Sequence, residues 1–192
     1  MNQIKFILSA IVSAFLLSNC VSVTADAVGA AAGATAAVST EPRTQGVVVD
    51  DNRNETKLQF KYNSKYDKSN IYVTSYNGTV LLTGQVPDEK TKENVEFDAR
   101  VVPGVKHIYS YLAIRLPQSI ASRSGDSLIT TKIRTKILGI EGVKVANVKV
   151  ITTNAVVYLF GIVNKTEAMK VAEAAASITG VEKVITLFEY VK

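Results

Sequence analysis

Between residues 70 and 86, hydrophobic and polar side chains alternate in the way that is typical of β-strands with one buried face. Asn77–Gly78 interrupts the alternation, and this pair strongly favours a two-residue hairpin turn. Residues 147–163 show the same alternation around Asn154–Ala155. The second turn signal is weaker, because alanine tolerates a positive φ poorly. The pattern predicts two β-hairpins.

The two hairpins are copies of one internal repeat. Aligned without gaps, they share the same residue at Asn70, Val73, Asn77, Val80, Leu82, Gly84 and Val86 in the first copy, and at Asn147, Val150, Asn154, Val157, Leu159, Gly161 and Val163 in the second. A Gly-Val pair then closes each copy, at Gly104–Val105 and at Gly180–Val181. A duplication explains this agreement far better than chance does.

A helix is predicted to follow each hairpin. In the second repeat, Asn164 precedes a segment of helical periodicity and Glu167 comes three residues later, which is the pattern of a capping box. In the first repeat, Pro87–Asp88 opens the matching segment. Gly180 fits the position just past a helix end, and a last strand near 182–191 completes the second repeat.

Another helix is predicted before each hairpin. In the second repeat it covers residues 126–138, with Asp126 as its N-cap. Isoleucines recur on one face of it at helical spacing, at Ile129, Ile133 and Ile137. In the first repeat the matching segment, around 51–65, has poor periodicity. The prediction is an α+β protein of two tandem αββαβ domains, each a three-stranded mixed sheet packed on two helices.

The N-terminus has the layout of an export signal. Lys5 supplies a positive charge, and residues 6–17 form an apolar segment that is too short for an ordinary membrane-spanning helix. Leu17-Ser18-Asn19-Cys20 then resembles the lipobox of bacterial lipoproteins, in which the cysteine is acylated and becomes the new N-terminus. The alternative is an ordinary secretory signal that is cleaved slightly later. Under the lipoprotein interpretation, Val21 after the cysteine implies sorting to the outer membrane.

The αββαβ order, with Gly-Val before the last strand, resembles the BON domain. The segments NVKVITTNAVVYLFGIV and SITGVEKV look like its central signature, and Gly84 and Gly161 match a glycine in the second strand of that family. Two such domains behind a lipobox resemble the dual-BON outer-membrane lipoproteins, over about residues 41–192. The resemblance implies a non-enzymatic, phospholipid-binding protein that supports envelope integrity, acts near the division site and associates with the machinery that assembles outer-membrane proteins.

These features divide the chain into five parts. They are a signal peptide at 1–19, a lipidated Cys20 with a flexible Ala/Gly/Ser/Thr-rich tether at 20–45, a first domain at 46–115, a linker at 116–125 and a second domain at 126–192. The mature protein is therefore expected at the periplasmic face of the outer membrane, held by its acyl chains.

The helix predicted at 126–138 carries the candidate membrane site. Leu128 lies about 100° from the isoleucine stripe, and no acidic residue occurs between Leu128 and Ile140. Apolar side chains beside cations favour binding to anionic lipid. The candidate lipid-binding residues are Leu128, Thr131, Lys132, Arg134, Thr135, Lys136, Leu138 and Ile140. The alternative is that Leu128 and Ile140 cover an edge of their own domain or contact the other one.

Both sheets carry further signals. Gly84 and Gly161 lie within strands, where glycine weakens a strand unless another element approaches closely, so we expect a helix to cross each of them. The sheet face away from the helices is apolar in the second repeat and is expected to pack against the first domain, through Val156, Tyr158, Phe160 and Ile162. The same face of the first repeat is more polar and is expected to be wetter, at Thr79, Leu81, Thr83 and Gln85.

Composition narrows the classes of function. A single cysteine excludes an intramolecular disulfide framework, and with one histidine, His107, a zinc site is disfavoured. No nucleophile–base pair or phosphate-binding loop is visible, so we expect no enzymatic activity, cofactor or metal. The net charge of only +5 and the export signal disfavour nucleic acid. The alternative to lipid binding is a periplasmic protein–protein adaptor for the assembly machinery or a peptidoglycan-associated partner.

Overall fold

The computed structural model describes residues 42–115 and 121–191. Residues Ser39–Lys192 form one compact unit that contains both repeats. The lipobox and Cys20 lie outside the described residues. No helix in the described part of the chain combines the length and the apolar character that crossing a bilayer requires.

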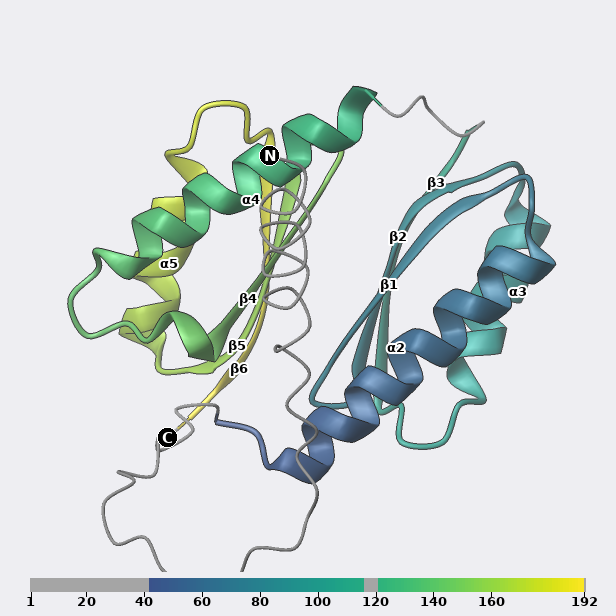
Figure 1. Ribbon diagram of the computed structural model, residues 1–192, viewed down its shortest axis with the longest axis horizontal. Helices are drawn as coiled ribbons and strands as arrows, with labels where there is room; N and C mark the ends of the chain where they lie inside the picture. The colour runs from purple at the N-terminus through teal and green to yellow at the C-terminus, as the bar shows by residue number, and fades with distance from the viewer. Residues whose placement is uncertain (1–41, 116–120, 192) are drawn as a thin grey trace, which may run out of the picture. The chain divides into compact units, whose positions relative to one another are not determined.

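Each repeat has the order helix, strand, strand, helix, strand (Figure 1). The first repeat consists of α2 (Gln45–Lys65), β1 (Asn70–Tyr76), β2 (Thr79–Val86), α3 (Glu89–Arg100) and β3 (His107–Ile114). The second consists of α4 (Ala121–Leu138), a short 3-10 turn η1 (Val145–Asn147), β4 (Val148–Thr153), β5 (Val156–Val163), α5 (Lys165–Ala176) and β6 (Lys183–Tyr190). The predicted αββαβ order is confirmed.

Each sheet is mixed, as predicted. β1 pairs with β2 antiparallel and β3 joins β2 in parallel, and β4, β5 and β6 repeat this arrangement. Within each repeat the two helices cover one face of the sheet (Figure 1). Two separate hydrophobic cores lie between helices and sheet, one around Leu58 and Leu82 and the other around Ile133 and Leu159.

An aspartate caps each hairpin turn, and Asp51 is buried whereas Asp126 is half-buried. Asp51 accepts hydrogen bonds from the backbone N–H groups of Asn77 and Gly78, at 2.6 and 2.9 Å. Asp126 accepts from those of Asn154 and Ala155, at 2.8 and 2.9 Å. Both turn residues of each hairpin have positive φ, including Ala155 at 60°. The aspartates therefore stabilise backbone conformations that the turns require.

The predicted start of α4 is wrong. We expected Asp126 to be its N-cap, but the helix begins at Ala121, and the Asp126 carboxylate binds the hairpin turn. In the first repeat, α2 also begins earlier than the predicted segment, at Gln45, where the side chain of Thr44 accepts from the backbone N–H of Val47. In both repeats the aspartate near the predicted helix start binds a distant hairpin turn.

The glycines within the strands are also explained differently from the prediction. A Cβ atom at Gly84 would lie 1.8 Å from the backbone oxygen of Asn70, and one at Gly161 would lie 2.6 Å from that of Asn147. The closest neighbour is thus the backbone of the adjoining segment, where the hairpin partner strand begins, and no helix crosses there. Gly84 additionally has a φ of +117°, which side-chain-bearing residues rarely adopt.

The outer faces of the two sheets meet. Tyr76 and Leu81 of the first repeat form one buried cluster with Tyr158 and Phe160 of the second, as predicted for the apolar face. Burial raises the pKa of Tyr158 to about 12, with a further contribution from Tyr111, whose ring centroid lies 5.1 Å away. The expectation of a wetter first face is wrong, because all four residues named for it are buried: Thr79, Leu81, Thr83 and Gln85.

Candidate functional site

Helix α4 separates its apolar side chains between two faces. Ile133 and Ile137 are fully buried in the second core, and Ile129 is nearly so. Leu128 and Leu138 point elsewhere and remain 62% and 70% exposed. Exposed leucines beside cations are side chains that can enter the interface of a membrane. The predicted division between an isoleucine core stripe and a second, outer apolar face is therefore present in the structure.

A groove runs between α4 and the end of α5, and we call it the α4–α5 groove. Its volume is about 440 Å³. Four of the predicted residues line it from α4, together with three residues that follow α5: Thr131, Lys132, Thr135, Lys136, Ser177, Ile178 and Thr179. The ammonium group of Lys136 donates a hydrogen bond to the hydroxyl of Ser177. The groove thus combines two cations with several hydroxyl groups.

Four of the eight predicted residues do not line the groove. Arg134 lines a different hollow, of about 370 Å³, together with Arg43 and Lys149. Ile140 is half-buried and packs against the second core, so it offers less apolar surface than we expected. The structure brings together Thr131, Lys132, Thr135 and Lys136 in the groove, and it leaves Leu128 and Leu138 exposed on the same helix.

The cations of the outer face have no acidic partner. Throughout residues 42–115 and 121–191, no ion pair involves Lys132, Arg134 or Lys136. Within the same residues no cluster of histidine, cysteine and acidic side chains could hold a metal ion. The positive charge of this helix is therefore available to an anion from outside the protein.

The first repeat neutralises the cation that matches Lys136: counted from Asp51 and Asp126, Lys61 of α2 holds the place of Lys136 on α4. Lys61 and Lys65 of α2 both pair with Asp98 of α3, at 2.8 and 2.9 Å. Burial raises the pKa of Asp98, but hydrogen bonds from the two lysines and Tyr66 outweigh it, so its pKa is lowered overall. Counted from the buried valines Val95 and Val171, the residue that matches Asp98 in the second repeat is Ala174. The second repeat therefore lacks the acid that neutralises the lysines of α2 in the first repeat.

Sequence reasoning missed the contribution of α5 to the groove. Ser177 and Thr179 follow α5 directly and lie far from α4 in the sequence. The prediction that both helices cover the same face of one sheet was the available signal, because it places the end of α5 beside α4. The individual neighbours could not be deduced from that arrangement alone.

Comparison with known proteins agrees with this architecture. The BON domain family matches residues 50–115 and 125–192. The outer membrane lipoprotein DolP of Haemophilus influenzae is 40% identical over 166 residues, which cover 82% of this chain and 84% of that protein. The 21 kDa hemolysin of Actinobacillus pleuropneumoniae is 36% identical over 155 residues, which cover 79% of this chain and 80% of that protein.

A solved structure, the C-terminal domain of CdsD, a structural protein of the type III secretion system of Chlamydia trachomatis, matches 78% of this chain and 100% of its own. Its sequence identity to this chain is 13%, and the TM-score is 0.31.

Proposed function

Because the chain belongs to the BON-domain family and is an outer-membrane lipoprotein, we propose that it binds anionic phospholipid through the outer face of α4. In this role it supports envelope integrity without catalysing a reaction. The observation that carries the proposal is the contrast at Asp98 and Ala174. In the first repeat Asp98 neutralises Lys61, which holds the place of Lys136, and in the second repeat the position of Asp98 is an alanine.

The chemistry of the outer face suits a lipid surface. Leu128 and Leu138 can enter the acyl boundary, while Lys132 and Lys136 meet phosphates. Each lysine near an anionic surface contributes on the order of 1 kcal/mol. The hydroxyl groups that line the α4–α5 groove can donate to phosphate oxygens as well. Apolar insertion and charge attraction together favour the second repeat over the first.

The test is co-sedimentation of the compact unit, residues 39–192, with vesicles of phosphatidylethanolamine and phosphatidylglycerol. Lys132→Glu reverses one charge and is expected to weaken binding by about tenfold or more at low salt. Its matched control is Lys57→Glu, because Lys57 holds the same place on α2 as Lys132 holds on α4, counted from Asp51 and Asp126. The control is expected to leave binding nearly unchanged.

Two further variants test the apolar contact and the missing acid. Leu128→Glu is expected to abolish most binding, whereas Leu128→Ala is expected to weaken it with less dependence on salt. Ala174→Asp introduces the acid of the first repeat and is expected to pair with Lys136 and weaken binding. Circular dichroism verifies that each variant is folded. A folded Leu128→Glu protein that sediments like the parent would overturn the proposed site.

The second candidate is a protein–protein adaptor in the periplasm. Phe97 and Val101 lie one turn apart on and just after α3, and both are more than half exposed. An exposed apolar pair of this kind fits a protein contact, such as one with the outer-membrane assembly machinery or a peptidoglycan-associated partner. Pull-down from envelope extracts with a Phe97→Ser variant distinguishes this function, since that change leaves α4 intact.

Lipidation is proposed at Cys20, the only cysteine of the chain. Two or more acyl chains anchor a protein stably, because each buried methylene contributes about 0.8 kcal/mol. Cys20→Ser is therefore expected to yield a protein that takes up no labelled fatty acid, and that is either released from the membrane or held by its uncleaved signal. Labelled fatty acid on the Cys20→Ser protein would place the modification elsewhere.

A further inference from the structure

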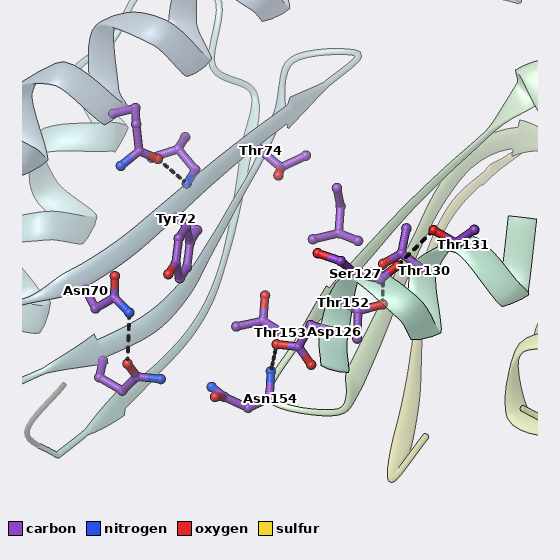
Figure 2. Close-up of a pocket in the computed structure, with 14 residues that line it drawn as sticks. Asn70, Tyr72, Thr74, Asp126, Ser127, Thr130, Thr131, Thr152, Thr153 and Asn154 are labelled. Atoms are coloured by element: carbon purple, nitrogen blue, oxygen red, sulfur yellow. Dashed lines mark hydrogen bonds between the residues drawn. The ribbon is translucent and has the colours of Figure 1, made fainter. Parts of the chain in front are cut away.

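A second cavity, which we call the inter-repeat cavity, is lined by both repeats (Figure 2). Asn70, Thr74 and Gln85 contribute from β1 and β2 of the first repeat. Thr130 of α4 and Thr152 of β4 contribute from the second. Its volume is about 520 Å³, which lies within the range of about 300–1,000 Å³ that small-molecule sites occupy.

The wall of this cavity is rich in hydroxyl and amide groups. Figure 2 shows side chains of both kinds lying around the same space, including Asn70, Thr74, Thr130, Thr152 and Asn154. Among the described residues that line it, none is a lysine, an arginine or a histidine. An anionic ligand would find no cation here, and so the composition favours an uncharged one.

Asp126 is the charged residue of the wall, and the hairpin turn already occupies its carboxylate. Its two oxygens accept hydrogen bonds from the backbone N–H groups of Asn154 and Ala155. A strongly bound cation would have to compete with these bonds. The remaining polar groups are neutral, which again favours a neutral ligand with hydroxyl or amide groups of its own.

The polar groups of the wall retain capacity for a ligand. The hydroxyl of Thr130 donates to that of Thr152 at 2.7 Å, and the amide of Asn70 donates to that of Gln85 at 3.4 Å. A threonine hydroxyl offers one donor and two acceptor positions, so the bond between Thr130 and Thr152 does not saturate either of them. Ile151 and the ring of Tyr72 add apolar surface to the same wall.

A sugar has the complementary chemistry, since its edges carry hydroxyl groups and its ring faces carry C–H groups. We propose that the inter-repeat cavity binds an uncharged sugar unit of a periplasmic glycan. Residues from both repeats are needed to form it, so a single repeat would not have the site. Thr131 of α4 lines this cavity as well as the α4–α5 groove. Helix α4 would thus contact a glycan on one side and a membrane on the other.

The experiment is a titration of residues 39–192 with N,N′-diacetylchitobiose, followed by two-dimensional amide NMR. The fragment contains all three hydrophobic clusters of the chain's described part, which makes it a suitable folded unit. We expect concentration-dependent shifts at residues that line the inter-repeat cavity. Inorganic phosphate is expected to shift none of them. No shifts with the sugar, or the same shifts with phosphate, would overturn the proposal.

The decisive variant is the double substitution Thr130→Val and Thr152→Val. It removes both partners of one hydrogen bond and replaces them with apolar groups of the same shape, so its effect on folding is expected to be small. Sugar binding is expected to weaken by about tenfold or more. The matched control is Thr186→Val on β6, an exposed threonine outside this cavity, which is expected to bind the sugar like the parent. Equal binding by the double variant and the control would also overturn the proposal.

This test is independent of the lipid proposal. Vesicle binding depends on Leu128 and Lys132, which do not line the inter-repeat cavity. The valine pair is therefore expected to co-sediment with vesicles like the parent, while it loses the sugar. Loss of both properties would instead indicate a general defect of the fold, and it would count against the sugar site.

Discussion

The two repeats share one framework and differ mainly in how polar groups are placed on it. Both have the same strand pairing and an aspartate that caps the hairpin turn. Counted from these aspartates, Tyr62 matches Ile137 and Asn54 matches Ile129. In the first repeat the hydroxyl of Tyr62 donates to the backbone oxygen of Val95 at 2.7 Å, within the core. Hydrogen bonds therefore contribute to the packing of α2 in the first repeat, whereas α4 packs against its core through isoleucines.

This difference indicates which positions of the repeat can change their side chains. Positions that face the sheet stay buried in both copies, although the size and polarity of their side chains differ. On the outer helix face the charges differ between the two copies. In the first repeat Asp98 forms ion pairs with Lys61 and Lys65. In the second repeat the cations of α4 remain available to an anion from outside the protein. A duplicated fold can thus keep one copy for structure and adapt the other for binding.

The largest expected effect distinguishes the two strand glycines. Gly84→Ala is expected to destabilise the protein by more than about 3 kcal/mol, because the new Cβ would overlap the oxygen of Asn70 and the φ of +117° is strained for alanine. Gly161→Ala meets Asn147 at a longer 2.6 Å and is expected to cost about 1–3 kcal/mol. Urea denaturation of residues 39–192 measures both. Equal losses would show that neither the closer backbone contact nor the positive φ makes Gly84 the more constrained position.

The turn-capping aspartates give the second comparison. Asp51 accepts from the hydroxyl of Ser75 and the guanidinium of Arg43 as well as from its turn, and it is almost fully buried. Asp51→Ala is expected to cost about 3–5 kcal/mol, since it leaves buried donors and a cation without their partner. Asp126→Ala removes only the two turn bonds and is expected to cost about 1–3 kcal/mol. The free energy of unfolding in urea decides whether the first turn is held more strongly.

The sequence predicted every strand and the second helix of each repeat, because alternation, the Asn77 turn signal and the capping box at Asn164 are local features. It described α2 poorly for a physical reason. Asn54 and Tyr62 occupy core positions of that helix, and a count of apolar residues does not register them. The start of α4 was misplaced, because nothing local distinguishes an aspartate that caps its helix from one that caps a distant turn.

The candidate lipid site was predicted in part. Separating Leu128 from the isoleucine stripe needs only the helical repeat, so that step succeeded. Ile140 packs against the core and Ser177 lines the groove, and both positions depend on how α5 and the following loop pack against α4. The sequence of α4 alone does not give that packing. The contrast between Asp98 and Ala174 was readable from the aligned repeats, but its meaning required the ion pairs of the first one.

The third comparison concerns pH. Because the pKa of Asp98 is lowered in the folded protein, its bonds add stability at pH values above its ordinary pKa of 3.8, and this stability is lost as the pH falls through the folded value. Asp98→Asn is therefore expected to cost about 1–3 kcal/mol at neutral pH and progressively less in acid. Its control is Asp67→Asn, at an exposed aspartate of the same repeat. A cost that stays constant down to pH values well below 4 would contradict the ionic origin.

The smallest expected effect sharpens the comparison of the two hairpin turns. Ala155 adopts a φ of 60°, in the left-handed region that costs a side-chain-bearing residue roughly 1–2 kcal/mol, whereas the first repeat has Gly78 in that place. Ala155→Gly is expected to stabilise the protein by about 1 kcal/mol, because relief of the strain exceeds the added entropy of the unfolded chain. The reverse change, Gly78→Ala, adds strain and brings a Cβ within 2.9 Å of the backbone oxygen of Gly104, so it should destabilise. Urea denaturation of both variants is the measurement. If Ala155→Gly lowers the stability, the turn must be held so firmly by Asp126 that its φ carries no strain, and the two hairpins would be equivalent despite their different residues.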